Sequence, residues 1–332
     1  MGQEEKMLMA LMERCGAGTP KQEIVRVSGG LLHRMYRVET ERGVYAVKHL
    51  NPEIMARPGV MENFCRAEQL ERKLQQRKIP IVPALEFDGR KMQEISGEYF
   101  YIFRWLDGAR TDPENINPEM CREVGRILGQ IHAVESFRKE PPEDTGGTID
   151  FSGYLQAAEG KDEELHKLLR ENLTVLSETL EKLKQAEAAL PPICCITDDD
   201  MDPKNVMWKD GAAYVIDLEC LDYGNPAKSV LILALQWCGT LSGDFQKARL
   251  QAFFEGYLSE YDNGFRSYDS LFGIAYDWVH WLEYNIRRAL GLTGAAEEER
   301  ALGMKEVVGT LRIIRYLYEK EPEICAALRE VK

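Results

Sequence analysis

Three polar side chains near the middle of the chain have the types and the spacing that phosphoryl transfer requires. Asp200 is followed five residues later by Asn205, and twelve residues after that by Asp217. A carboxylate can orient a hydroxyl nucleophile, and carboxylate and amide oxygens suit a magnesium ion. The transition state of phosphoryl transfer has much charge to stabilise. We therefore predict that Asp200 is the catalytic residue and that Asn205 and Asp217 bind metal.

An acidic turn in solvent is the alternative interpretation of the same segment, because residues 198–202 read DDDMD. Short strand-like runs flank this turn at 193–196, 206–208 and 214–216. Such runs would hold the polar groups on rigid elements. These flanks, with the family resemblance given below, favour the functional interpretation.

Lys48 lies at the end of another strand-like run, VYAVK at 44–48. Its ammonium group would leave the strand and neutralise oxygens of the α- and β-phosphates of a nucleotide. The alternative is an ordinary lysine at a strand end, in solvent. Glu68, on the helical segment that follows, is expected to pair with Lys48 and to fix its position, and Glu71 is the rival for that role.

A glycine segment, Ser28-Gly29-Gly30, lies between the first two strand-like runs. Adjacent glycines let backbone N–H groups approach phosphates closely, so we assign these three residues to nucleotide binding. The signal is weak, because such a pair is usually only a turn. No GxxxxGK[ST] sequence occurs, which excludes a P-loop enzyme.

The bulk properties limit the class of protein. The 332 residues are enough for two domains, and no apolar run approaches the roughly 18 residues of a membrane span. A net charge of −13 argues against a nucleic-acid partner and would attract a cationic substrate, although solubility is the simpler explanation. The eight cysteines include no CxxC pair, which indicates reduced thiols in a cytoplasmic protein. The lack of a long apolar run argues against a membrane partner.

The first hundred residues predict an antiparallel sheet with one helix laid on it. Helical periodicity over 59–77 stops before Pro80 and Pro83, and a short amphipathic helix fits 3–15. Strand-like runs occupy 23–27, 35–38, 44–48, 83–87 and 98–103.

Helices dominate the rest of the chain. Helical patterns cover 118–133, 162–188 and most of 226–331, with Gly239, Gly256 and Gly291 near possible helix ends. We expect an α+β fold with a connector near residue 105. The family resemblance given next implies that residues 1–105 form a nucleotide-binding lobe and that residues 106–332 form a catalytic and substrate-binding lobe.

Several segments together resemble the aminoglycoside phosphotransferase and choline kinase-like superfamily. Residues 200–206, DMDPKNV, resemble its D-x-x-P-x-N catalytic loop, and residues 216–219, IDLE, resemble its metal-binding I-D-[FW]-E segment. The nucleotide lysine and the L-x-x-L-H helix end are matched by AVK at 46–48 and LGQIH at 128–132. The matches follow the family's order over about residues 20–230.

The resemblance implies a protein-kinase-like fold with ATP and Mg²⁺ between its lobes. It also implies that the phosphate acceptor is a hydroxyl group of a small molecule, which could be cationic. Residues 99–106 resemble the hinge that reads the adenine edge, with Phe103, Arg104 and Trp105 at its centre. No residue identifies the acceptor, the choice of ATP over GTP, or the oligomeric state.

Two departures from the family pattern affect this interpretation. Asp198 stands where the family has histidine, and its charge is expected to raise the pKa of Asp200. Lys228-Ser229-Val230 replaces the family's Asp-Leu. A catalytically silent nucleotide-binding module therefore remains the alternative, and a protein kinase is a weaker one, because no A-P-E-type segment follows Asp217.

The acceptor side is poorly specified by the sequence. In the family the C-terminal helices bind the acceptor, so Asp277 and Glu283 would be available to an amine-bearing sugar. The simpler interpretation places Trp278, Trp281 and Leu282 in the core and leaves the charged residues in solvent.

Overall fold

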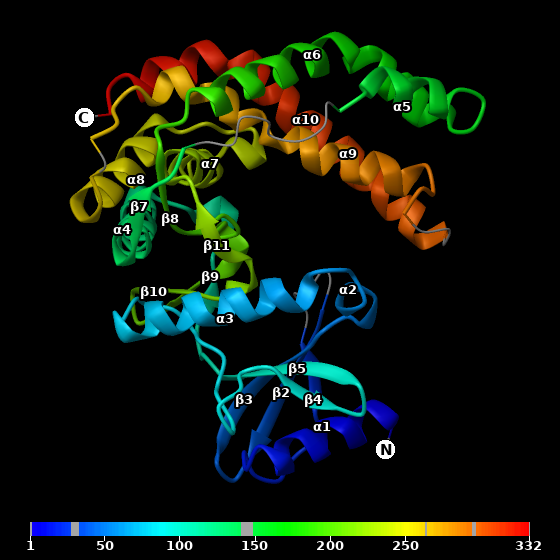
Figure 1. The fold of residues 1–332 in the computed structure, drawn as a ribbon, viewed down its shortest axis with the longest axis vertical. Coiled ribbons are helices and arrows are strands. Elements are labelled where there is room, and N and C mark those ends of the chain that lie inside the picture. Colours follow the sequence, from blue (N-terminus) through cyan, green and yellow to red (C-terminus); the bar gives the residue numbers. More distant parts are fainter. Residues whose placement is uncertain (1, 28–32, 141–148, 263, 294–296, 332) are drawn as a thin grey trace. The chain divides into compact units, whose positions relative to one another are not determined.

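A computed structural model describes residues 2–27, 33–140, 149–262, 264–293 and 297–331 (Figure 1). The chain divides into two compact units. The first contains residues 1–111 and 204–222, and the second contains residues 112–203 and 223–332. Residues 204–222, which include two of the predicted site residues, thus belong by their contacts to the first unit. The assignment of nucleotide binding to 1–105 and of catalysis to 106–332 stays a prediction.

The first unit is built on a five-stranded antiparallel sheet. Its strand order is β1 (Val25–Val27), β2 (Arg34–Thr40), β3 (Gly43–His49), β5 (Glu98–Arg104) and β4 (Gln93–Ile95). Ser96 and Gly97 join the last two strands with φ of 54° and 80°, the backbone that a two-residue hairpin needs.

The predicted strand at 83–87 is wrong. Isolated bridges, Ala84 with Phe103 and Phe87 with Arg90, are the only pairings of this segment among the described residues. Pro83 has no N–H to donate, and the chain turns back at Asp88, which has a φ of 49°. The proline and the turn leave too few residues between them for a regular strand with paired hydrogen bonds.

Two helices cover the sheet, one on each face (Figure 1). Because side chains alternate along a strand, Phe100 and Ile102 of β5 pack with α1 (Gln3–Arg14). Tyr101 and Phe103 point to the opposite face, towards α3 (Val60–Gln76), which follows the short α2 (Pro52–Met55). The helix expected at 59–77 is confirmed, and α1 is a second helix on a sheet for which one was expected.

A small second sheet in this unit has the order β10 (Ala212–Val215), β9 (Val206–Lys209) and β6 (Ala109–Arg110). β9 and β10 form a hairpin whose turn residues, Asp210 and Gly211, have φ of 51° and 81°. Asp-Gly is a preferred sequence for such a turn. The hairpin lies between two 3-10 turns, η2 (Pro203–Asn205) and η3 (Leu218–Cys220).

The second unit is mostly helical, as predicted. Its longer helices are α4 (Pro118–Val134), α5 (Phe151–Ala158), α6 (Glu163–Ala188), α7 (Pro226–Trp237), α8 (Lys247–Glu260), α9 (Trp278–Ala289) and α10 (Glu297–Leu328). Short 3-10 helices are η1 (Pro113–Asn115), η4 (Thr240–Ser242) and η5 (Tyr268–Asp277), and a sheet has the order β11 (Leu221–Gly224), β8 (Ile193–Asp198), β7 (Ser136–Arg138). No helix in the described ranges has the length and hydropathy to span a membrane.

Glycines let α4 and α8 touch through their backbones. A Cβ atom on Gly125 of α4 would lie 2.1 Å from the carbonyl oxygen of Phe253, and one on Gly256 of α8 would lie 1.9 Å from that of Arg122. Any side chain at either position would force the helices apart. The expectation that Gly256 marks a helix end is therefore wrong, because this glycine lies inside α8 at a close helix–helix contact.

Candidate active site

The β9–β10 hairpin brings the two predicted metal ligands to one end of the same element. Val206 pairs with Val215, and the N–H of Ile216 donates to the carbonyl oxygen of Asn205 at 2.9 Å. Asn205, 5% exposed, therefore lies beside the backbone that leads into Asp217. The contact is local, since both residues flank one short hairpin.

The backbone of Asp217 adopts a left-handed conformation, with φ 64° and ψ 58°. Few residues other than glycine adopt it, although aspartate tolerates it better than most. Strained backbone of this kind clusters at functional sites. The conformation at Asp217 begins η3 and turns the chain back, so that Glu219 lies close to the same lysine as Asp217.

Lys48 lies between two carboxylates of this turn. Its Nζ is 2.7 Å from Oδ1 of Asp217 and 2.7 Å from Oε1 of Glu219. Only 6% of the lysine side chain is exposed. Burial by itself would lower the pKa of Lys48, but the charges of Glu219 and Asp217 outweigh it and raise the pKa above the ordinary value. The lysine is therefore a firmly protonated ammonium group.

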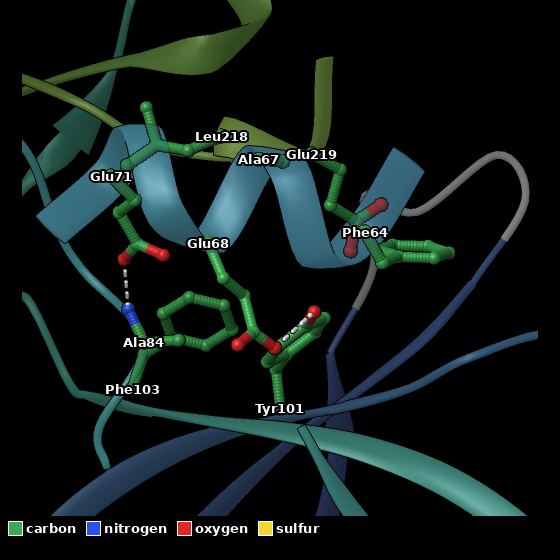
Figure 2. Close-up of a pocket in the computed structure, with 9 residues that line it drawn as sticks. All are labelled: Phe64, Ala67, Glu68, Glu71, Ala84, Tyr101, Phe103, Leu218 and Glu219. Carbon is green, nitrogen blue, oxygen red and sulfur yellow. Dashed lines mark hydrogen bonds between the residues drawn. The ribbon is translucent and has the colours of Figure 1, made fainter. Parts of the chain in front are cut away.

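The expected ion pair between Lys48 and Glu68 is not formed in this structure. Oε1 of Glu68 instead accepts a hydrogen bond from the hydroxyl of Tyr101 at 3.0 Å (Figure 2) and another from the N–H of Met92 at 3.1 Å. The physical reason is that the turn at Asp217 supplies two carboxylates to Lys48 from a different element.

The rival carboxylate, Glu71, has other partners as well. Its Oε1 accepts the N–H of Ala84 at 2.6 Å (Figure 2), and its Oε2 lies 3.1 Å from Nζ of Lys91. Both glutamates of α3 thus tie the helix to the segment that runs beside the sheet.

A small pocket lies between α3, β5 and η3, all in the first unit (Figure 2). Its walls combine aromatic rings with carboxylates: Phe64, Ala67, Glu68, Glu71, Ala84, Tyr101, Phe103, Leu218 and Glu219. Phe103, one of three residues predicted to lie at the adenine, is among them.

The other two predicted adenine residues pack against strands of the sheet. The guanidinium group of Arg104 lies 4.9 Å from the ring centroid of Tyr45, and that of Arg37 lies 5.5 Å from the ring of Trp105. The N–H of Trp105 donates to the carbonyl of Val44 at 3.0 Å. Adenine recognition by this segment stays a prediction.

Ser28, Gly29 and Gly30, which were assigned to phosphate binding, lie outside the described residues.

Asp200 belongs to the second unit, where β8 ends at the nearly buried Asp198. Oδ1 of Asp198 accepts the N–H of Asp200 at 3.3 Å, and its carbonyl oxygen accepts the N–H of Met201 at 3.3 Å. The indole of Trp237 donates to the carbonyl of Met201 at 3.0 Å. Asp198 thus holds the loop by hydrogen bonds. The catalytic role of Asp200 and its raised pKa stay predictions.

Asn225 anchors the turn where the family's aspartate is missing, a role that the sequence analysis did not assign. Its Oδ1 accepts the N–H groups of Ala227 and Lys228, at 3.0 and 3.4 Å. Its Nδ2 donates to the carbonyl oxygens of Pro191 and Ile193, at 2.8 and 3.2 Å. The available signal was an asparagine directly before a proline at a helix start, which is typical of an N-cap.

Lys228 neutralises one of the two acids assigned to the acceptor. Its Nζ lies 2.8 Å from Oδ1 of Asp277 and 3.1 Å from Oε1 of Glu187. Burial would raise the pKa of Asp277, but the hydrogen bond with His280 and the charge of Lys228 lower it to about 2. The carboxylate of Asp277 is thus ionised, and its charge is balanced within the chain.

The other predicted acceptor residues lie on α9. Glu283 accepts a hydrogen bond from the hydroxyl of Tyr154 at 2.7 Å. Leu282 is fully buried, as expected, but Trp281 is 39% exposed, so its placement in the core is wrong. It stacks on Tyr284 instead, with ring centroids 5.4 Å apart.

His132, in the segment that resembles the family's helix end, is fully buried. Its Nδ1 lies 2.9 Å from the hydroxyl of Tyr257, and burial lowers the pKa of His132 to about 3. In the unfolded chain a histidine has a pKa of about 6.5. Between these values the unfolded state binds more protons, so stability falls as the pH falls, by up to about 1.4 kcal/mol per pH unit.

We therefore expect His132→Phe to flatten the pH dependence of the free energy of unfolding between pH 6.5 and 4. Urea unfolding of both proteins across that range measures it. Tyr257→Phe is the matched control, because it removes the hydrogen bond and keeps the buried imidazole, and with it the slope. Equal slopes for wild type and His132→Phe would contradict the assignment.

Comparison with known proteins shows the family. Residues 23–265 match the model of the phosphotransferase enzyme family, APH. Stress response kinase A of Escherichia coli (strain K12) is 25% identical over 263 residues, 72% of each chain. Serine/threonine protein kinase RdoA of Salmonella typhimurium is 25% identical over 244 residues, 69% of this chain and 67% of that protein.

Solved structures show the fold. A spectinomycin phosphotransferase in complex with ADP and spectinomycin has a TM-score of 0.70 at 12% identity, covering 95% of this chain and 98% of the other. An ethanolamine kinase of Plasmodium vivax has a TM-score of 0.58 at 15% identity, with coverage of 89% and 83%. The predicted protein-kinase-like α+β fold is confirmed. Because the family model spans more than half of the 332 residues, the chain belongs to the phosphotransferase enzyme family.

Proposed function

We propose that this protein transfers the γ-phosphate of ATP to a hydroxyl group of a small molecule, with Mg²⁺ as the divalent ion. The observation that carries the proposal is the contact between Lys48 and Asp217, whose Nζ and Oδ1 atoms are 2.7 Å apart. A cation for the phosphates and a carboxylate for the metal thus lie side by side, although 169 positions separate them in the sequence.

The residues present fit a hard divalent cation. The side chain of Asp217 is 38% exposed, and the backbone carbonyl of Asn205 accepts the N–H of Ile216, the residue before Asp217. The side chains of Asp217 and Asn205 would supply a carboxylate and an amide oxygen. Magnesium prefers oxygen ligands and keeps several of its waters, so it needs few ligands from the protein. When bound, it would neutralise charge on the transferred phosphoryl group.

The remaining roles follow from the chemistry of the side chains. Lys48 would neutralise oxygens of the α- and β-phosphates. Asp200 would accept a hydrogen bond from the acceptor hydroxyl, orient it, and take its proton. The segment 103–105 would read the adenine, and Glu68 and residues 28–30 would complete the nucleotide site.

The acceptor class is supported by chemistry and by the ligands of structural neighbours. Those neighbours include a spectinomycin phosphotransferase, an amicoumacin kinase with AMP-PNP, Ca²⁺ and Ami, and an ethanolamine kinase. A net charge of −13 suits a cationic acceptor.

None of the eight cysteines, all within the described ranges, forms a disulfide, which supports a reducing compartment such as the cytoplasm.

A protein hydroxyl is the second candidate acceptor, because one relative is named a serine/threonine protein kinase. Transfer of γ-labelled phosphate from ATP, and separately from GTP, distinguishes the two. The panel contains spectinomycin, ethanolamine, choline, homoserine and a mixture of serine-rich proteins, with Asp200→Asn protein as the blank. Label on a small molecule supports the proposal, and label on protein alone favours the second candidate. Nucleotide binding without transfer to any acceptor would favour a silent module.

A further inference from the structure

We propose that Glu219, rather than Glu68 of α3, positions Lys48 for the nucleotide phosphates. This inference rests on the proposed function and assigns a positioning residue to its site. A lysine is a compact charge on a flexible four-carbon stem, so it presents its ammonium reproducibly only when a fixed acceptor holds it. Among the residues that the structure describes, Glu219 and Asp217 are the two carboxylates that contact Lys48.

Of these two carboxylates, Glu219 is the one that remains available to the lysine. Asp217 is 38% exposed and is the predicted metal ligand, whereas the side chain of Glu219 is 18% exposed. A cation bound to Asp217 would draw on the same carboxylate that Lys48 contacts. Glu219 would then be the partner that keeps the lysine in place.

Glu219 is itself held through its second oxygen. Nδ1 of His33 accepts the N–H of Asn51 at 3.0 Å. A backbone N–H can only donate, so Nε2 is the ring nitrogen that is left to donate, and it lies 3.3 Å from Oε2 of Glu219. One oxygen of the carboxylate is fixed by His33 and the other faces Lys48.

Glu68 is committed elsewhere. Its Oε1 accepts two hydrogen bonds, from Tyr101 and from Met92, and its Oε2 lies 3.6 Å from the guanidinium group of Arg72. The pocket lies between the carboxylates of Glu68 and Glu219 (Figure 2). The position of Lys48 is thus set by β3 and η3, and a shift of α3 would leave its ion pairs intact.

Two double-mutant cycles on the nucleotide-free protein test the pairing. One combines Lys48→Met with Glu219→Gln, and the matched control combines Lys48→Met with Glu68→Gln. We expect Glu219→Gln to lower the urea midpoint of the wild type, and to leave the midpoint of Lys48→Met unchanged or higher. In that background the substitution removes a carboxylate that no longer has Lys48 as its cationic partner. The Glu68 cycle is expected to be additive.

The same variants test positioning through the dissociation constant for Mg-ATP, measured by equilibrium dialysis. Glu219→Gln should weaken binding about tenfold, the loss of roughly one charge-assisted hydrogen bond, and should have little further effect in Lys48→Met. The effect of Glu68→Gln on binding should be the same in the wild type and in Lys48→Met, because the partners of Glu68 are Tyr101 and Met92. Coupling of Lys48 to Glu68 instead of Glu219 would overturn the inference while the proposed function stands. A wild type that binds no Mg-ATP, with the nucleotide-free cycle still coupled, would overturn the proposed function and the positioning role with it.

Discussion

Replacing Asp200 with asparagine is expected to lower kcat by about 10²–10⁴-fold and to leave the dissociation constant for Mg-ATP close to the wild-type value. The amide has nearly the shape of the carboxylate but cannot accept the proton of the acceptor hydroxyl. Lys48 and Asp217, the residues assigned to the phosphates and the metal, are unchanged. Steady-state rates with the best acceptor of the panel and equilibrium dialysis with Mg-ATP measure the two quantities.

Asp202→Asn is the matched control, because it makes the same change of charge two residues away in the same loop. It should retain most of the activity. Hydrogen bonds to Asp198 and from Trp237 to Met201 hold the backbone of this loop. If Asp200→Asn disturbed them, the variant would have a lower melting temperature. A correctly folded Asp200→Asn protein with wild-type turnover would show that another group orients the acceptor.

Replacing Asp217 with alanine is expected to weaken Mg-ATP binding by about 10–100-fold or more. Loss of a residue that only supports a metal ligand typically costs this much, and Asp217 is assigned as a ligand itself. The carboxylate also contacts Lys48 at 2.7 Å, so the substitution removes an anion from both the metal site and the phosphate site. Titration calorimetry of Mg-ATP, compared with ATP in excess chelator, separates the metal contribution.

Two further variants separate charge from backbone strain. Asp217→Asn keeps a residue that tolerates the left-handed backbone and removes only the charge. Asp210→Ala introduces alanine at a second position with positive φ. Asp210 is exposed, has a φ of 51° and lies in the turn of the β9–β10 hairpin. We expect Asp217→Asn to bind Mg-ATP weakly and Asp210→Ala to bind it normally. Unchanged binding by Asp217→Ala would remove the metal role.

Local pattern accounts for the parts of the site that lie close together in sequence. The strand-like runs at 206–208 and 214–216 predicted elements on either side of a turn, and the Asp-Gly turn closes them into the hairpin that places Asn205 beside Asp217. Helical periodicity placed α3, α4 and α6 within one or two residues of their bounds. Such patterns are readable because they depend on neighbouring residues and on which face is buried.

Pairing across the chain could not be read in this way. The sequence predicted that Lys48 needs an acid, and helical spacing offered Glu68 and Glu71 as candidates, but its partners are Asp217 and Glu219. The side chains of all four acids end in a carboxylate. The choice among them depends on distances that arise only when η3 packs beside β3.

The sequence by itself determined the family, the main helical segments, several of the strands and the chemical types at the site, since these depend on local spacing and composition. Tertiary structure alone decided that Gly256 is a contact between helices and not a helix end, that α1 covers the second face of the sheet, and which carboxylate meets Lys48. The physical reason is common to all three. Close packing selects one partner among several that are chemically equivalent, and that selection is a property of distance and volume in the folded chain.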